Sequence, residues 1–141
     1  MLALPWRKHS HLTVGSRVVD LVEGESCPGV DTTGSVLWDA SQELLDHLME
    51  EKEKQNCCTD LSCVLELGGG TGALAAALAI AGAQKVVCTD KASQLPLIAR
   101  NALLNNVEDR VEARELHFGQ VMWIIRDKRG ERKDKMFVGD S

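Results

Sequence analysis

Apolar and polar residues follow two different patterns along the middle of the chain. Between residues 40 and 54, leucines and a methionine recur at spacings of three and four among charged residues, which predicts an amphipathic helix that Asp39 or Ser41 can cap. Residues 62–67 form a compact apolar run that ends in three glycines, and the stretch 73–81 that follows is rich in alanine and leucine. This order predicts a strand, a tight turn and a helix.

The strand and helix patterns then repeat. Residues 85–89 predict a second strand, residues 94–105 carry leucine and isoleucine at helical spacing, and residues 110–116 predict a third strand. Strands that alternate with helices of about twelve residues are joined by right-handed crossovers into a parallel sheet. We therefore predict an α/β fold, a Rossmann-like parallel sheet with helices on both faces.

The first part of the chain has a weaker pattern. Residues 17–22 alternate loosely between apolar and polar and predict a short strand, and residues 24–34 contain the glycines and the proline of a loop. We interpret residues 1–33 as an N-terminal extension and residues 34–141 as the start of the α/β domain.

Composition and charge narrow the classes of partner. The chain has 141 residues, 44% of them hydrophobic and 26% charged, which is typical of one globular domain. Its net charge is −5, and the only dense basic stretch, residues 126–135, also holds three acidic residues, so we expect no nucleic-acid partner. No apolar run approaches the roughly 18 residues of a membrane span. We expect a soluble protein of the cytoplasm, with the nucleus as the alternative location.

The five cysteines indicate reduced thiols. Their number is odd, no pair has the C-x-x-C spacing, and the N-terminus breaks into proline and charge after four residues, unlike a secretion signal. Cys63 and Cys88 lie in the apolar strand runs, where we expect them to act as small core residues. We expect no metal site.

The glycine turn between the first strand and its helix is the main candidate for chemistry. Gly68, Gly69 and Gly70 are followed by a threonine and Gly72. Residues without Cβ atoms adopt positive φ and let a ligand approach the backbone, here beside the positive end of a helix. In parallel sheets, ligands bind beyond the carboxyl ends of strands at such turns.

Two ligands fit the spacing of this turn. Gly68, Gly70 and Ala73 satisfy the dinucleotide fingerprint G-x-G-x-x-G/A, and Asp90, twenty positions after Gly70, lies where an acid binds a ribose. Glu66 instead produces E-x-G-x-G-x-G, the form found in S-adenosylmethionine (SAM)-dependent methyltransferases of the seven-strand class. SAM has no pyrophosphate to place at the helix, and an acid can balance its positive charge. Asp90 would then accept hydrogen bonds from both ribose hydroxyls, unless it is only a helix cap.

Three further segments resemble the protein-lysine methyltransferases that act on chaperones and elongation factors. Gly34–Ser41 resembles the entry segment G-x-x-V-W-D-A-A of that family, Glu115–Gly119 resembles E-L-x-W-G, and Asp134–Ser141 can be laid on D-x-I-L-G-A-D-x-x-Y. The resemblance implies a seven-strand methyltransferase fold, SAM as cofactor and a lysine side chain of a protein as substrate.

The resemblance also assigns roles to single residues. It implies that Trp38 contacts the cofactor, that Phe118 takes the place of a tryptophan beside the adenine, and that Gly139 lies close to the adenine. Asp140 is the predicted catalytic residue, aligning the acceptor amine or the methionine end of SAM. Lys135 and Gly139 depart from the family pattern, as does Phe118, which lacks the indole N–H. Core packing for Trp38 and Phe118, and a charged tail for residues 134–141, are the alternatives.

The length of the chain bounds how much of such a fold it can hold. Each strand-helix-strand step takes roughly thirty residues, so residues 62–141 supply about four of the seven strands. We expect a domain that ends after the fourth strand and transfers methyl groups poorly. A SAM-binding fragment without activity and an NAD-dependent oxidoreductase remain the alternative functions.

Overall fold

Three parallel strands form a sheet in their order along the chain. The computed structural model describes residues 6–24, 33–54, 60–117, 121–122 and 138–139. Within them the strands of the sheet are β3 (Cys63–Leu67), β4 (Lys85–Asp90) and β5 (Val111–Glu115). Two helices make the crossovers that parallel pairing requires, α2 (Ala73–Ile80) and α3 (Leu95–Leu104). The predicted α/β, Rossmann-like class is confirmed.

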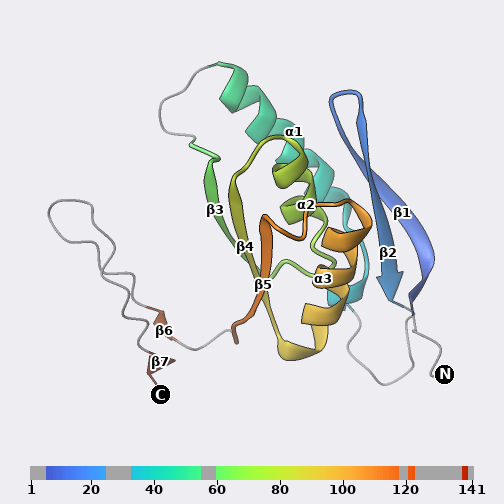
Figure 1. Ribbon diagram of the computed structural model, residues 1–141, viewed down its shortest axis with the longest axis vertical. Helices are drawn as coiled ribbons and strands as arrows, with labels where there is room; N and C mark the ends of the chain where they lie inside the picture. The colour runs from blue at the N-terminus through green and yellow to red at the C-terminus, as the bar shows by residue number, and fades with distance from the viewer. Residues whose placement is uncertain (1–5, 25–32, 55–59, 118–120, 123–137, 140–141) are drawn as a thin grey trace, which may run out of the picture.

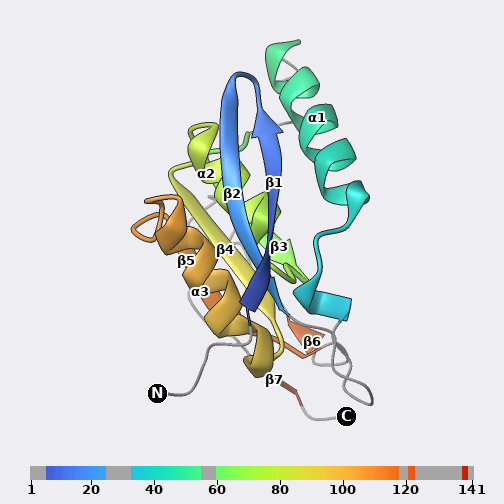
Figure 2. The same ribbon diagram turned by 90° about the vertical axis from the view of Figure 1, so that its right-hand side faces the viewer.

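The elements are arranged in three layers (Figure 1). The sheet forms the first layer, the helices the second and an antiparallel hairpin the third; Figure 2 shows the hairpin in front of the helices. The hairpin consists of β1 (Trp6–Val14) and β2 (Arg17–Gly24), and α1 (Asp39–Glu53) packs beside α2. Among the described residues, the helices cover one face of the sheet, so the prediction of helices on both faces is met on one face only.

The exposed face of β3 explains one wrong prediction. Cys63 is exposed, and Leu65 and Leu67 on the same face of β3 are 43% and 55% exposed. Side chains of a strand point alternately to its two faces, and the expectation of a buried Cys63 assumed that both were covered. Cys88 of the middle strand points to the helices and is fully buried, as predicted.

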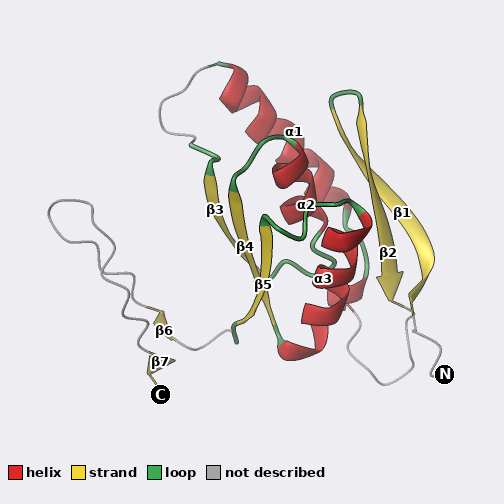
Figure 3. Cartoon of the chain, viewed as in Figure 1, coloured by secondary structure: helices red, strands yellow, loops and turns green. Residues whose placement is uncertain are grey.

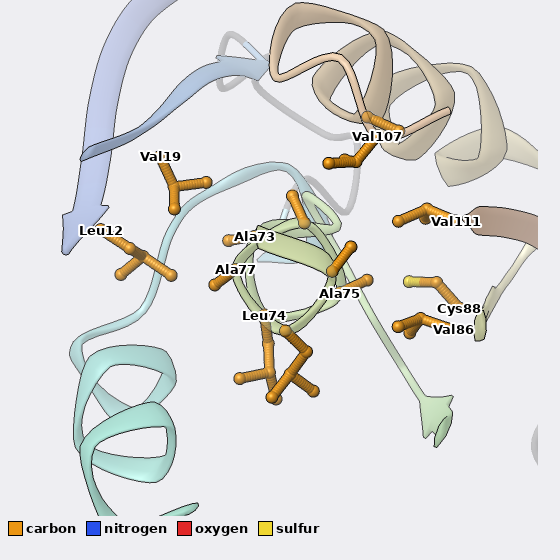
Figure 4. Close-up of a cluster of buried hydrophobic side chains, with 14 of the residues drawn as sticks. Leu12, Val19, Ala73, Leu74, Ala75, Ala77, Val86, Cys88, Val107 and Val111 are labelled. Atoms are coloured by element: carbon orange, nitrogen blue, oxygen red, sulfur yellow. The ribbon is translucent and has the colours of Figure 1, made fainter. Parts of the chain in front are cut away.

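Helix α2 is the centre of the core. Every side chain from Ala73 to Ala79 is buried, which is typical of a helix that is covered on all sides. Figure 4 shows this helix end-on, with Leu12 and Val19 of the hairpin on one side and Val86 of the sheet on the other. The many alanines of α2 let both layers approach closely. The hairpin therefore shares the core of the α/β layers, while the domain boundary at residue 34 stays a prediction.

The C-terminal end of α2 is bound by three cationic side chains from three other segments. Arg110 Nη1 donates to the carbonyl of Ala79 over 2.6 Å, Arg17 Nη1 to that of Ile80 over 2.7 Å, and Lys52 Nζ to that of Ala81 over 3.0 Å. The helix itself has no basic residue in its last turn. These side chains bind carbonyls at the end of the helix, of which that of Ala79 also accepts the N–H of Gly82 over 3.1 Å, and they offset the negative end of the helix dipole.

Two helices begin differently from their predictions (Figure 3). Helix α1 begins at Asp39, its N-cap is Trp38, and no side chain caps it, so the expected capping by Asp39 or Ser41 is wrong. Asp39 lies within the first turn, where its charge is favourable beside the helix dipole. Helix α3 follows a short 3-10 turn at Ala92–Gln94 and begins at Leu95.

The segment predicted as a fourth strand is described only in part. Strand β7 (Val138–Gly139) pairs antiparallel with β6 (Val121–Met122) and not with the parallel sheet. The described parallel sheet therefore has three strands rather than four. Only three consecutive residues of this segment, 136–138, are apolar, which is little to specify a place in a buried sheet. In the part of the chain that the structure describes, no helix is long and apolar enough to cross a membrane.

Candidate functional site

The turn that follows β3 has a backbone conformation that favours glycine. Gly68, Gly70 and Gly72 have φ of 69°, 57° and 75°, in the left-handed region that residues with side chains rarely adopt. The amide of Gly69 donates to the carbonyl of Thr89 over 2.9 Å, which ties the turn to the neighbouring strand. The amide of Gly72 donates back to the carbonyl of Gly69 over 2.8 Å and closes the turn at the start of α2.

Asp90 holds this turn from the end of β4. Its Oδ2 accepts the N–H of Gly70 over 2.7 Å, and its Oδ1 accepts the N–H of Lys91 over 2.7 Å. Each carboxylate oxygen has two lone pairs, so both oxygens can accept a further hydrogen bond. The same residue thus shapes the turn and presents two acceptors beside it.

The entry segment lies directly against the turn. A Cβ on Gly70 would come within 2.9 Å of the carbonyl oxygen of Gly34. Ser35 Oγ is 3.3 Å from Oε1 of the buried Gln94, and the ring N–H of Trp38 donates to the carbonyl of Thr33 over 3.0 Å. The indole of Trp38 is 59% exposed, although large apolar rings are usually covered. Trp38 therefore presents an exposed aromatic side chain four residues along the chain from Gly34, which contacts Gly70.

Glu66 is enclosed on the other side of the turn. A Cβ on Gly69 would overlap Sγ of Cys88 and lie 3.4 Å from the carboxyl carbon of Glu66. The carboxyl group hydrogen bonds to the thiol of Cys88 and the backbone N–H of Ala75, at the start of α2. Its Oε2 atom is buried and has no hydrogen-bond partner within the described residues.

The surroundings of Glu66 favour its neutral form. Burial raises its pKa from the ordinary 4.5 to about 7, and the negative charge of Asp90 adds to this, whereas the hydrogen bonds from Cys88 and Ala75 oppose it. Burial, followed by the proximity of Glu66, also raises the pKa of the Cys88 thiol, so Cys88 is an unreactive neutral group. A cation that reached Glu66 would stabilise its carboxylate.

The predicted site residues divide into two groups. Glu66, the glycines 68–70 and Asp90 are brought together at the carboxyl end of the sheet, and Trp38 belongs to the segment that touches them. Phe118 and Asp140 lie outside the described residues, and Gly139 is described only as the partner of Val121 in the small antiparallel pair. The roles given to these three stay predictions. The described residues contain no group of three or more potential metal ligands.

Three residues of this region were not identified from the sequence. Cys88 lies under Gly69, Gln94 packs against Gly34, and Asn101 donates to the carbonyl of Thr71 in the turn. Only Asn101 left a usable signal, because this polar residue occupies the apolar face of a helix.

A glycine turn between a parallel strand and a helix, with an acid at the end of the next strand, is the arrangement by which Rossmann-like proteins bind nucleotide cofactors. Comparison with protein families shows to which family of Rossmann-like proteins the chain belongs. The model of a family described as lysine methyltransferase matches residues 25–133. The chain belongs to this lysine methyltransferase family.

One curated relative is longer and carries a different description. A protein of Schizosaccharomyces pombe named diaminohydroxyphosphoribosylamino-pyrimidine deaminase is 36% identical to this chain over 85 residues. The match covers 60% of this chain and 21% of that protein, so the chain corresponds to about a fifth of its relative. The deaminase activity in the name is stated of that whole protein.

Proposed function

We propose that this chain binds SAM at the glycine turn and forms the cofactor-binding part of a protein-lysine N-methyltransferase. Membership of the lysine methyltransferase family supports the class of reaction. The observation that carries the choice of cofactor is the carboxyl group of Glu66, which is enclosed beneath Gly69 with one oxygen unpartnered.

The position of Glu66 argues against a pyrophosphate at this turn. A dinucleotide places its pyrophosphate at the N-terminus of the helix after the glycines, where free N–H groups attract anions. Here the Ala75 N–H is bonded to Glu66, and that of Gly70 is bonded to Asp90. The negative charge of Asp90 repels an anion at the turn. A ligand with positive charge would instead stabilise the carboxylate of Glu66, and SAM has such charge at its sulfonium and amino groups.

The residues around the glycine turn would each contact a different part of the cofactor. The two oxygens of Asp90 would accept hydrogen bonds from the ribose hydroxyls while Oδ2 keeps the amide of Gly70 in place. Glu66 would lie on the side of the positively charged methionine end. Trp38 offers an exposed flat ring next to the segment that touches Gly70.

When bound, SAM supplies a methyl group on a positively charged sulfur, which retains the electron pair of the broken bond as a thioether. The acceptor lysine must have lost its proton, since its nitrogen lone pair forms the new bond. Positioning the amine in line and excluding water are the main contributions that the protein can make. Asp140, which the family resemblance assigns to aligning the amine, lies outside the described residues.

Isothermal titration tests the choice of cofactor. SAM or its demethylated product, S-adenosylhomocysteine, should bind the chain, and NAD should give no heat of binding. Asp90→Asn keeps an acceptor for Gly70 but removes the charge, so we expect the affinity to fall about tenfold or more. Asp109→Asn, the same change at an exposed position before β5, should bind normally. Binding of NAD alone would contradict the proposal.

A second experiment tests the acceptor. The chain is incubated with a protein extract and SAM carrying a labelled methyl group, and the proteins are hydrolysed to amino acids. Label recovered as methyl-lysine supports the proposed acceptor, and label on another amino acid refutes it. Cofactor binding without any transfer would favour a binding fragment without activity of its own.

A further inference from the structure

Asn101 of α3 and Asn105, the C-cap residue of the same helix, form a ladder with the edge of β2. Oδ1 of Asn101 accepts the N–H of Val22 over 2.8 Å, and its Nδ2 donates to the Val22 carbonyl over 3.0 Å. Asn105 repeats this with Asp20, over 3.0 Å and 2.7 Å. Four residues of helix rise about 6 Å and two residues of strand about 6.6 Å, so one helical turn matches one repeat of the strand. Figure 2 shows β2 on the side of the hairpin that faces α3.

This ladder replaces a third strand. Each asparagine amide offers a donor and an acceptor in the arrangement of a backbone peptide group. The edge of β2 is therefore paired at Asp20 and Val22 without another strand, and the hairpin is held in register along α3. Both asparagines contribute to this attachment.

Only Asn101 extends the ladder to the glycine turn. The second hydrogen of its Nδ2 donates to the carbonyl of Thr71 over 2.8 Å, and the side chain is fully buried. The additional hydrogen bond of Asn105 goes to the carbonyl of Asn101 within the same helix, over 2.8 Å. One amide group thus joins the backbone of the hairpin to the backbone of the turn.

We propose that Asn101 is a positioning residue, through which the hairpin fixes the conformation of the glycine turn and thereby the affinity for the cofactor. The proposal rests on the proposed function. The hydrogen bonds of Asn101 link the hairpin, which is distant in sequence, to the residues that would contact SAM.

The conformation of the turn explains why this link matters. Thr71 lies between Gly70 and Gly72, both at positive φ, where glycine backbone has many alternatives. A buried carbonyl must have a donor, and the Thr71 carbonyl finds one in Asn101. Without that donor, the peptide group between Thr71 and Gly72 would be more stable in another orientation, in which its carbonyl forms a hydrogen bond with a different partner. The amides of both glycines, and with them the contact to Asp90, would then lose their fixed directions.

Two matched variants separate positioning from attachment. Asn101→Asp and Asn105→Asp each replace the donating amide by an acceptor, so both lose a rung of the ladder and should lower the midpoint of urea unfolding. Titration with S-adenosylhomocysteine, under conditions where both variants are folded, should show a dissociation constant raised about tenfold or more for Asn101→Asp. For Asn105→Asp we expect less than about a threefold change.

The outcomes distinguish this inference from the proposed function. Equal loss of affinity in the two variants, or none in Asn101→Asp, would overturn the positioning role while leaving cofactor binding intact. Failure of the unmutated chain to bind S-adenosylhomocysteine would overturn the proposed function and this inference with it.

A measurement on the unmutated chain covers the case in which Asn101→Asp does not fold. Coupling between two sites is reciprocal, so a ligand at the turn should strengthen the rung that Asn101 makes with β2. Hydrogen exchange at the Val22 amide, bonded to Asn101, should slow more on adding S-adenosylhomocysteine than exchange at the Asp20 amide, bonded to Asn105. Equal slowing of the two amides, or none, would contradict the link.

Discussion

Replacing Glu66 by glutamine should change how the stability of the chain depends on pH. The glutamine keeps the shape and an oxygen that can accept the N–H of Ala75, but it cannot ionise. In the unmutated chain, burial raises the pKa of Glu66 from 4.5 to about 7. Folded and unfolded chains therefore hold different numbers of protons between these two values, and the variant removes that difference.

The sign and size of the effect follow from this pKa. Below about pH 4.5, Glu66 is protonated in both the folded and the unfolded chain, so its ionisation does not lower the free energy of unfolding. As pH rises toward 7, the unfolded chain releases its proton first, so the unmutated chain loses stability relative to Glu66→Gln, and above pH 7 the loss is complete. At about 1.4 kcal/mol for each tenfold change in acidity, the full loss is about 3 kcal/mol.

Urea unfolding of both chains, measured from pH 4 to pH 9, tests this. The difference between their free energies of unfolding should change by about 3 kcal/mol, in favour of the variant at high pH. Glu112→Gln provides a control of opposite sign when the measurement is extended to about pH 3, because hydrogen bonds from Lys85 and Arg114 lower the pKa of Glu112 from 4.5, and its contribution to stability is lost only as pH falls below that value. A difference between Glu66→Gln and the unmutated chain that is independent of pH would refute our view of Glu66 as an enclosed, neutral acid.

Three further substitutions test the packing around α2 by thermal or urea unfolding. Gly69→Ala should destabilise the chain, because the added methyl overlaps the Cys88 thiol, and the cost should be smaller by about 1 kcal/mol in a Cys88→Ala background. Ala76→Leu should cost about 1 to 3 kcal/mol by overpacking, while Ala99→Leu on the exposed side of α3 should change stability by less than about 0.5 kcal/mol. Arg110→Met should cost about 1 kcal/mol through the lost carbonyl contact at the end of α2.

Each of these predictions has a result that would contradict it. Additive effects of the Gly69 and Cys88 substitutions would mean that the two sites do not touch. Tolerance of leucine at position 76 would show that the layers around α2 are loosely packed. An Arg110 variant as stable as the unmutated chain would make its contact with the helix end energetically neutral.

Much of the fold could be predicted from the sequence because its signals are local. The apolar run before Gly68, the alanine-rich stretch after it and the spacing of the second unit each specify one element, and alternation of strand and helix implies parallel pairing. For the elements predicted between residues 17 and 116, the observed boundaries differ from the predicted ones by at most two residues, whereas strand β1 was not predicted. Register and layering depend on contacts between distant residues, which is why the sequence did not predict that Asn101 and Asn105 pair with the edge of β2, although Asn101 stands out as a polar residue on an apolar helix face.

The site was predictable to the same extent. Glu66 and Asp90 could be singled out because their distances from the glycines in the sequence reflect their places at the ends of neighbouring strands. Their present partners could not be foreseen. That Cys88 would fill the space under Gly69 depends on the pairing of β3 with β4, and the approach of Gly34 to Gly70 depends on a loop without periodic pattern.

The third layer has a consequence for any shortened version of this protein. The residues that match the family begin at position 25, after the end of the hairpin. A chain cut there would expose the alanine face of α2 that Leu12 and Val19 cover, and would remove Arg17 from the end of the same helix. An eight-residue helix has little stability of its own. Expression boundaries chosen from the family match alone would therefore remove part of the support of the glycine turn.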